Sequence, residues 1–111
     1  MRIWTKDDAT WATPPGHFGG LTVADIVPFA GRNFSVQVSV APPVGGGERH
    51  HHETWAQVFY VVAGELTFDT GERRFTLRQG ESVLFEPGDP HLTLNEGAGE
   101  SVSLVITVAE D

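Results

Sequence analysis

The sequence predicts an all-β domain, and three features of the chain indicate it. From about residue 20 onward, apolar and polar residues alternate with period two, and many apolar positions carry β-branched or aromatic residues. Short segments rich in Gly, Pro and Asp interrupt the alternation about every 8 to 12 residues. No stretch carries the sustained 3.6-residue stripe of an amphipathic helix. Such a pattern is typical of an antiparallel sandwich or barrel.

The elements follow one another without a linker or an internal repeat. Residues 1–20 precede the alternation and are expected to form an extended arm laid over the barrel, because they carry a Pro-Pro-Gly run and two tryptophans. Nine strands are then expected at residues 21–27, 34–41, 48–52, 55–62, 65–69, 73–77, 82–86, 91–95 and 102–108. The later turns are expected at 63–64, 69–72, 79–80, 87–90 and 96–99.

Length and composition favour one folded domain. The chain has 111 residues, 40% of them hydrophobic, which is enough for one modest core but too few for two. We therefore expect residues 1–111 to form a single domain.

The charge of the chain excludes two classes of partner. Seven Lys and Arg against 15 Asp and Glu give a net charge of -8, which repels nucleic acid and anionic membrane surfaces. Apolar runs such as 58–63 are far shorter than the roughly 20 residues of a membrane helix. The N-terminus has no apolar signal core, so we expect a cytoplasmic protein.

The absence of cysteine leaves metal chemistry to histidine, carboxylate and amide side chains. His50 and His52 are two apart in an expected strand, so both imidazoles should project from one face while His51 faces the other. Gln57 interrupts an apolar strand, and a buried amide needs partners. His91 begins a later strand directly after a turn. Together these side chains predict a site with three nitrogen ligands and one oxygen ligand, although residues 50–52 could also form an exposed polar strand.

The spacing of these residues resembles the two motifs of the cupin superfamily. The first motif reads G-x5-H-x-H-x3 or x4-E-x6-G, and the second reads G-x5-P-x-G-x2-H-x3-N. The positions that keep the spacing are His50, His52 and Gly64 in the first motif, and Gly80, Gly88, His91 and Asn95 in the second. The sequence departs from the motifs at three positions. Gly45 is one residue closer to His50 than the first motif requires, Gln57 stands in place of the Glu of the first motif, and Glu86 stands in place of the Pro of the second. The motifs and their strands cover about residues 36–95.

The resemblance implies an antiparallel jelly-roll barrel, also called a double-stranded β-helix, that is usually a homodimer. It also implies a divalent transition metal, Zn, Fe, Ni or Mn, held by His50, His52 and His91 with Gln57 as the fourth ligand. A neutral Gln would leave the full charge of the ion, giving a stronger Lewis acid that is held less tightly. The alternative role for Gln57 is to hydrogen-bond a metal-bound water. Cupins with a His-x-His-x4-Gln site include enzymes that linearise unsaturated uronates, and small single-domain cupins include aromatic polyketide cyclases.

Two further histidines are candidate catalytic residues. His17 lies in a Gly- and Pro-rich run of the arm, which could fold over the barrel mouth and offer a proton carrier; a solvated loop histidine is the alternative. His51 could also move a proton. Phe59 and Val61 share a face with Gln57. Several residues of the strand 34–41, either Phe34, Val36 and Val38 or the residues that alternate with them, are expected to face the same interior. Any remaining cavity is therefore predicted to accept a largely apolar or aromatic compound.

The sequence thus favours a metal-dependent enzyme that acts on a small organic substrate containing a carbonyl or enol. The ion would act as a Lewis acid in a cyclase, isomerase or lyase reaction. A non-haem Fe(II) dioxygenase is the first alternative, because it uses the same ligands. A non-catalytic cupin that binds a metabolite or a metal is the second.

Overall fold

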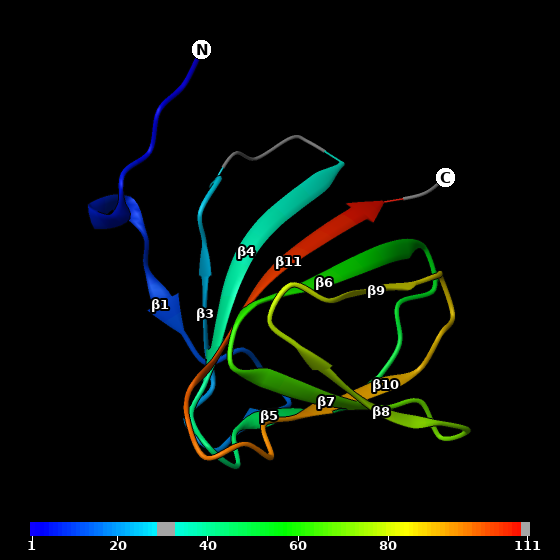
Figure 1. Ribbon diagram of the computed structural model, residues 1–111. Helices are drawn as coiled ribbons and strands as arrows, with labels where there is room; N and C mark the ends of the chain where they lie inside the picture. Colours follow the sequence, from blue (N-terminus) through cyan, green and yellow to red (C-terminus); the bar gives the residue numbers. More distant parts are fainter. Residues whose placement is uncertain (29–32, 110–111) are drawn as a thin grey trace.

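In the computed structural model, which describes residues 1–28 and 33–109, two antiparallel sheets face each other (Figure 1). The described strands are β1 (Trp11–Ala12), β2 (His17–Phe18), β3 (Thr22–Asp25), β4 (Phe34–Ala41), β5 (Gly46–His50), β6 (Trp55–Ala63), β7 (Glu65–Asp69), β8 (Arg74–Arg78), β9 (Ser82–Phe85), β10 (His91–Leu94) and β11 (Ser101–Ala109). A short 3-10 helix, η1 (Lys6–Asp8), precedes them. No helix in the described residues is long and apolar enough to cross a bilayer.

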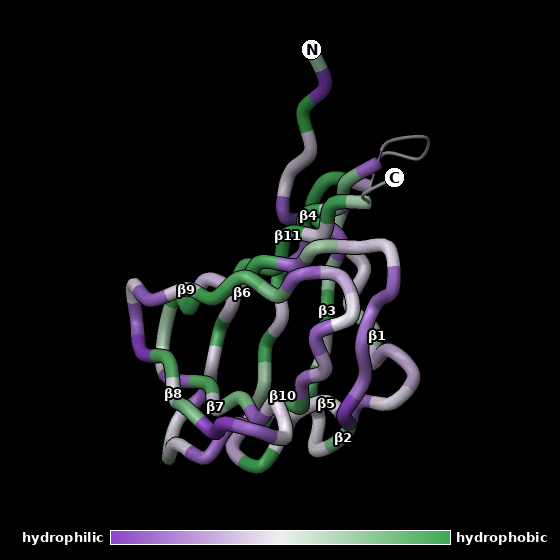
Figure 2. Tube along the Cα trace, turned by 90° about the vertical axis from the view of Figure 1, so that its right-hand side faces the viewer, coloured by the Kyte–Doolittle hydropathy of each residue, from purple (hydrophilic) through white to green (hydrophobic). Residues whose placement is uncertain are grey.

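The sheet topology brings together strands that are distant in sequence. The larger sheet has the order β1-β3-β4-β11-β6-β9 and the smaller sheet the order β2-β5-β10-β7-β8. The last strand, β11, therefore lies between β4 and β6. Figure 2 shows the two layers from the side, with β6 and β9 over β7 and β8. All nine expected strands are present, and the all-β jelly-roll barrel is confirmed.

One expected strand is displaced by two residues. The alternation predicts a strand over 48–52, whereas β5 spans Gly46–His50 and His52 lies beyond its end. The reason is that Gly46 and Gly47 pair with Leu94 and Thr93 of β10. A Cβ at Gly46 would collide with the Thr93 carbonyl, so only glycine lets the two backbones approach this closely. The prediction that His50 and His52 share one strand is wrong.

The hydrophobic core fills one end of the barrel. Its buried members come from both sheets: Phe59, Val61, Leu66, Phe68, Phe85 and Val105. The rings of Phe59 and Phe68 lie 5.1 Å apart in an edge-to-face arrangement, which aromatic pairs prefer. Phe85 extends the core to His91, whose imidazole stacks on it at 4.1 Å. The core thus forms the floor under one of the candidate ligands.

The N-terminal arm lies along the barrel and pairs with both sheets. β1 pairs with β3, and β2 pairs with β5. The second pairing sets His17 opposite Gly47 on the strand that carries His50. The arm therefore adds a histidine next to the candidate site.

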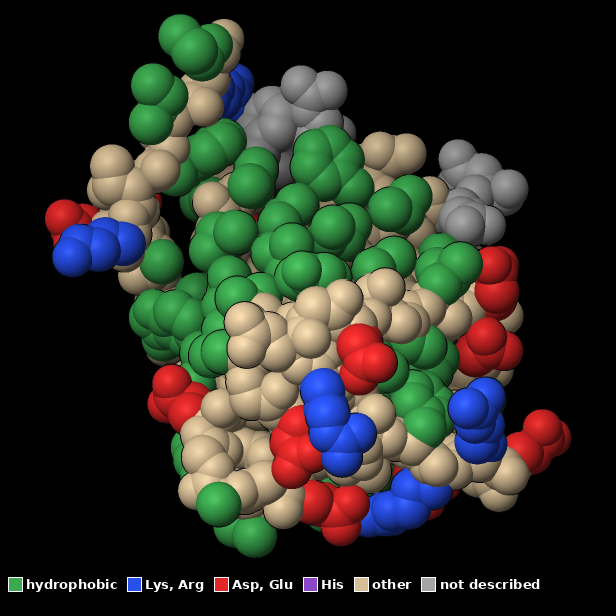
Figure 3. Space-filling view, in the orientation of Figure 1, with side chains coloured by type: hydrophobic (Ala, Val, Ile, Leu, Met, Phe, Trp, Pro, Cys, Tyr) green, Lys and Arg blue, Asp and Glu red, His purple; other side chains and the backbone are tan. Residues whose placement is uncertain are grey.

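The larger sheet presents apolar side chains outward. The residues of β4, β6, β9 and β11 that alternate with the inward-facing ones form this outer face: Phe34, Val36, Val38, Val40, Ala56, Val58, Tyr60, Val62, Ser82, Leu84, Val102, Leu104, Ile106 and Val108. Figure 3 shows hydrophobic side chains gathered over this sheet, with acidic and basic side chains below them. Tyr60 and Leu84 remain 42% and 53% exposed.

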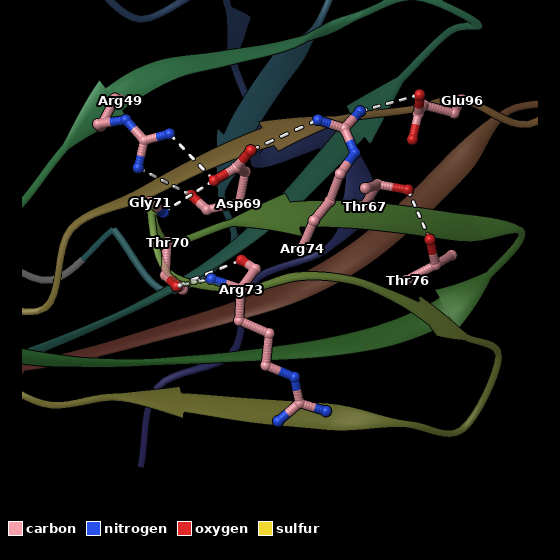
Figure 4. Close-up of polar contacts among 9 residues, drawn as sticks. All are labelled: Arg49, Thr67, Asp69, Thr70, Gly71, Arg73, Arg74, Thr76 and Glu96. Carbon is pink, nitrogen blue, oxygen red and sulfur yellow. Dashed lines mark hydrogen bonds and ion pairs between the residues drawn. The ribbon is translucent and has the colours of Figure 1, made fainter.

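A polar network ties together the strands of the smaller sheet (Figure 4). Asp69, at the end of β7, accepts hydrogen bonds from the Gly71 N–H at 2.8 Å and from Arg49 Nη2 at 3.1 Å. Arg74 pairs with Asp69 at 3.5 Å and with Glu96 at 2.9 Å. The Gly71 hydrogen bond, followed by that from Arg49, lowers the pKa of the Asp69 carboxyl. Because Arg49 precedes His50 on β5, the network braces the strand that carries a candidate ligand.

Candidate metal centre

His50 and His91 are brought together by strand pairing. They are register partners on β5 and β10, so their side chains lie on the same face of the smaller sheet. Their ring centroids are 4.5 Å apart. His52, just beyond β5, lies 5.1 Å from His50 and 6.4 Å from His91. The structure therefore clusters the three histidines that the spacing predicts as ligands.

The hydrogen bonds of these histidines leave Nε2 available. Nδ1 of His50 lies 2.8 Å from the Glu48 carbonyl oxygen, and Nδ1 of His91 lies 3.4 Å from that of Asp89. Because a carbonyl only accepts, Nδ1 carries the proton in both rings and Nε2 keeps its lone pair. Nε2 of His91 is buried without a partner in the described residues.

Burial favours the neutral form of two of the three clustered histidines, His52 and His91. His91 is 1% exposed, and burial, aided by the charge of His50, lowers its pKa to about 4. Burial followed by the neighbouring histidines also lowers the pKa of His52. A neutral imidazole is the form that binds a metal ion, so these pKa shifts favour ligation over protonation near neutral pH.

Gln57 contributes an unpartnered oxygen. It faces inward from β6 and is 9% exposed. Its Nε2 donates to Thr107 Oγ1 at 3.1 Å, whereas its Oε1 is buried with no partner in the described residues. The Thr107 contact thus holds the amide with its acceptor atom free.

The donor chemistry of the cluster fits a divalent transition metal. Three imidazole nitrogens and an amide oxygen match the ligand preferences of such ions, and two of these atoms are buried orphans. Within the described residues, 1–28 and 33–109, no three His, Asp or Glu side chains are positioned to bind one ion together. The imidazole of His52 stacks on the Trp55 indole at 4.9 Å. The fit therefore rests on the identity and the free atoms of the donors.

A cavity of about 320 Å³ opens beside the cluster, lined by His50, His52 and Gln57 among others. Its larger-sheet side includes a polar wall, formed by Ser35, Gln37, Ser39, Gln57 and Thr107. Apolar side chains contribute the larger part of the exposed lining: Pro14, Leu21, Val23, Trp55, Phe59, Leu66 and Val105. The lining contains no Lys, Arg, Asp or Glu. A larger open groove of about 560 Å³ between β8 and β9 contains none of the histidines.

The polar wall is an addition to the mostly apolar cavity that the sequence predicts. The alternation of β4 left open which of its two faces points inward, and the cavity was expected to be largely apolar. The register with β11 turns Ser35, Gln37 and Ser39 inward and sends the valines to the outer face. Sequence reasoning missed these three residues because apolar side chains are ordinarily the buried set of a strand.

His17 lies at the cavity, as the sequence allows. Its ring centroid is 6.2 Å from that of His50, and its Nδ1 lies 3.0 Å from the Pro15 carbonyl oxygen. A Cβ on Gly47 would come within 3.0 Å of His17 Nε2, so the missing side chain makes room for the ring. Gly47 is a functional neighbour that the sequence did not single out.

The other predicted residues lie away from the cavity. His51 is half exposed and lies 3.8 Å from Glu53 on the surface, so the structure does not bring it to the cluster. Asn95, the last residue of the second motif, is 1% exposed. Its Nδ2 donates to the carbonyls of Ala41 and Gly99, and its Oδ1 accepts from Gly97 N–H. Asn95 therefore holds the connection between β10 and β11 rather than facing the cavity.

Comparison with known proteins gives a family match and several structural relatives. The cupin domain model matches residues 37–108, and no curated protein matches the chain. The polyketide cyclase RemF from Streptomyces resistomycificus has a TM-score of 0.84 and 22% identity over 99% of this chain and 80% of that one. A predicted oxalate decarboxylase from Thermotoga maritima has a TM-score of 0.82 and 17% identity over 91% of each chain. A sugar phosphate isomerase from Silicibacter pomeroyi has a TM-score of 0.81 and 17% identity over 96% of this chain and 75% of that one. At these identities, the likeness shows a shared fold.

Proposed function

The chain belongs to the cupin domain family, and from that premise we propose that it is a metal-dependent enzyme acting on a small carbonyl- or enol-containing substrate. One observation carries the proposal: Nε2 of His91 is buried without a partner beside the imidazoles of His50 and His52, and Oε1 of Gln57 is buried without a partner in the cavity that those two imidazoles line. Unsatisfied buried polar atoms are costly, and a site that keeps them needs a compensating ligand.

The ligands of the ion are His50, His52, His91 and Gln57. When bound, a divalent ion such as Zn, Fe, Ni or Mn supplies a Lewis acid for a carbonyl or enolate oxygen. Imidazole and amide ligands add no charge of their own to the ion that they bind. The core residues Phe59 and Phe85, which pack around His91, exclude water from that side of the site.

His17 is the proposed proton carrier. Its Nδ1 faces the Pro15 carbonyl, so its Nε2 is the atom that can accept a proton from a substrate and return it. Its position on the cavity surface, near His50, places that atom beside any bound substrate. His51 takes no part in the proposal because it lies outside the cavity.

The structural relatives support this reaction class by analogy only. Those described above are a cyclase, an isomerase and a predicted decarboxylase. None of these activities is an oxygenation, which favours the Lewis-acid reading over the dioxygenase.

Metal content is the first test. Elemental analysis of the purified protein, after loading with Zn(II), Ni(II), Mn(II) or anaerobic Fe(II), should find about one ion per chain. His91→Ala should abolish this binding, whereas His51→Ala, which removes a surface histidine, should not. Circular dichroism establishes that both variants are folded. A folded wild-type protein that takes up none of the four ions contradicts the proposal.

The reaction class needs a second measurement. Turnover of a carbonyl substrate by the Zn(II) or Ni(II) protein without oxygen supports the Lewis-acid enzyme. Oxygen consumption that depends on Fe(II) identifies the dioxygenase instead. Substrate binding without turnover by any of the four metal forms identifies a binding protein.

A further inference from the structure

We propose that the cavity binds an uncharged, polyhydroxylated carbonyl compound of about monosaccharide size. The inference rests on the proposed function for the reacting carbonyl, and it adds the chemistry of the rest of the substrate. The residues that carry it lie on the larger sheet, opposite the strands of His50 and His91.

Three side chains of the polar wall lack protein partners. Ser35, Gln37 and Ser39 alternate along β4, and the β11 register points them at the cavity. Within residues 1–28 and 33–109, no hydrogen bond from these three side chains to the protein is present. Each is partly buried, so a ligand that enters the cavity displaces its water. Only a ligand with its own hydrogen-bonding groups can replace those contacts.

The chemistry of the wall selects hydroxyl groups. Serine and threonine hydroxyls can each donate and accept, and a glutamine amide does both with separate atoms. The side-chain amide of Gln57 already donates to Thr107, and its oxygen remains free as an acceptor. A ligand hydroxyl, which also donates and accepts, can satisfy the free groups of this wall, whereas an aromatic hydrocarbon would leave Ser35, Gln37, Ser39 and the Gln57 oxygen unpaired.

The lining has no basic side chain for an anionic group at the polar-wall end of such a ligand, since the ion of the proposed function engages the carbonyl end. Phosphate and carboxylate groups are held by Arg, Lys or backbone N–H groups at helix ends. The cavity is lined by no Lys or Arg. A phosphorylated sugar would bring two charges into a site in a chain of net charge -8, with no basic side chain to receive them.

The size and the remaining lining agree with a small polyol. The volume of about 320 Å³ lies at the lower end of the roughly 300–1,000 Å³ typical of ligand pockets. Leu21, Phe59 and Leu66 supply apolar surface for the C–H groups of such a molecule. The carbonyl end then faces the histidines while the hydroxyls contact the polar wall.

Side-chain amide signals give a direct test. The chain has three glutamines, of which Gln37 and Gln57 lie in the polar wall and Gln79 is exposed in a turn. We would titrate ¹⁵N-labelled protein with D-glucose, D-glucose 6-phosphate and acetophenone. The expected result is that glucose shifts the amide signals of Gln37 and Gln57 but not that of Gln79. The phosphate ester and acetophenone should shift neither at the same concentrations.

Variants separate a binding wall from a structural one. The double variant Ser35→Ala with Ser39→Ala should weaken glucose binding about tenfold or more, since two hydrogen bonds are lost. Ser82→Ala, the same change on the opposite face of the larger sheet, should not affect binding. The melting temperature of the double variant should stay level or rise, because the serines have no protein partners. A large fall in melting temperature would reveal a structural role and overturn the inference.

Two outcomes separate this inference from the proposed function. If the protein binds one metal ion but glucose leaves both wall amides unshifted, the substrate class is wrong and the metal-dependent enzyme stands. If glucose shifts the wall amides in a protein that takes up no metal, the proposed enzyme is wrong and the polyol site stands. Stronger shifts with acetophenone or the phosphate ester than with glucose also overturn the inference.

Discussion

At the residue scale, the proposed metal site makes Gln57 the residue expected to set how tightly an ion is held. Its Nε2 is fixed by Thr107, which leaves one neutral acceptor where the cupin motif has a carboxylate. A neutral ligand gives up the Coulomb attraction that a carboxylate adds to a cation. We therefore regard Gln57 as a residue that exchanges metal affinity for a more electrophilic ion.

Gln57→Glu should hold the metal more tightly. The added negative charge attracts the ion, and the Thr107 hydroxyl can donate to the new carboxylate in place of accepting from the amide. We expect metal affinity to rise about tenfold or more, as measured by competition with a chelator. Gln57→Leu, of similar volume and without an oxygen, should lower it. An unchanged affinity in both variants would show that Gln57 does not contact the ion.

Gly47→Ala should displace His17. An added Cβ would lie 2.9 Å from His17 Cδ2 and 3.2 Å from Thr93 Oγ1, so the imidazole must move. We expect turnover to fall about tenfold or more because the proton carrier is misplaced, while metal content stays unchanged. The imidazole NMR signals of His17 report the movement. Gly99→Ala is the control, because no atom lies within 4 Å of its Cβ position. Unshifted His17 signals in Gly47→Ala would contradict this account.

At the element scale, alternation predicts where strands exist better than where they begin. β4 and β7 have the expected bounds, because both are uninterrupted runs flanked by turn residues. β5 begins two residues before the expected strand because Gly46 and Gly47 belong to it. Residue propensity assigns glycine to turns, but here the close approach of β10 holds both residues in the strand. The motif spacing still identified the three clustered histidines, since pairing between β5 and β10 depends on long-range register rather than on local propensity.

The inward face of β4 could not be derived from its own sequence. Its alternation of polar and apolar residues fits either orientation, and the usual rule buries the apolar set. Here the register with β11 turns the polar set inward, where a ligand can satisfy it. The sequence therefore predicted the ligand cluster but not the polar wall that completes the cavity.

The Asp69 network should contribute pH-dependent stability to the smaller sheet. The pKa of Asp69 is lowered from 3.8, chiefly by the Gly71 N–H and then by Arg49. A depressed carboxyl pKa means that the contribution is complete above about 3.8 and is lost as the pH falls through the lowered value. Asp69→Asn removes the charge that Arg49 and Arg74 pair with. Its melting temperature should lie below that of the wild type at pH 7, and the gap should narrow toward pH 2.

Melting curves across that pH range check the prediction. Glu53→Asn, which removes a carboxylate from the exposed surface, is the control and should leave the melting temperature nearly unchanged. If the difference in melting temperature between Asp69→Asn and the wild type stays constant with pH, the negative charge of Asp69 does not stabilise the smaller sheet.

At the scale of the whole molecule, the outer face is an apolar surface that we expect another protein surface to bury. The residues that β4, β6, β9 and β11 turn outward include no Lys, Arg, Asp or Glu. Contiguous apolar surface of this kind is rare on monomers and marks interaction sites. The four strands contain 30 residues in all, and at about 3.4 Å per residue and about 4.8 Å between strands they give roughly 500 Å² of plane before side-chain relief is counted. That footprint is more than half of the roughly 800 Å² per partner of a standard interface.

We propose that a second copy of the chain covers the outer face. A two-fold interface sets the same patch against itself, and two twisted sheets pack well face to face. The charge distribution agrees, because a net charge of -8 disfavours self-association through surfaces that carry the acidic residues. The outer face is such a surface, whereas the smaller sheet carries the Asp69, Arg74 and Glu96 network.

Sedimentation velocity should therefore find a particle of two chains at micromolar concentration. Tyr60→Lys and Leu84→Lys each place a cation on the outer face, and burying two such charges across a two-fold axis is costly. Both variants should shift the particle toward one chain, with their folds intact by circular dichroism. Val44→Lys is the control, because Val44 is 72% exposed in the connection between β4 and β5, away from the outer face. A wild-type particle of one chain, or a dimer that survives both lysines, would show that the outer face does not join two copies.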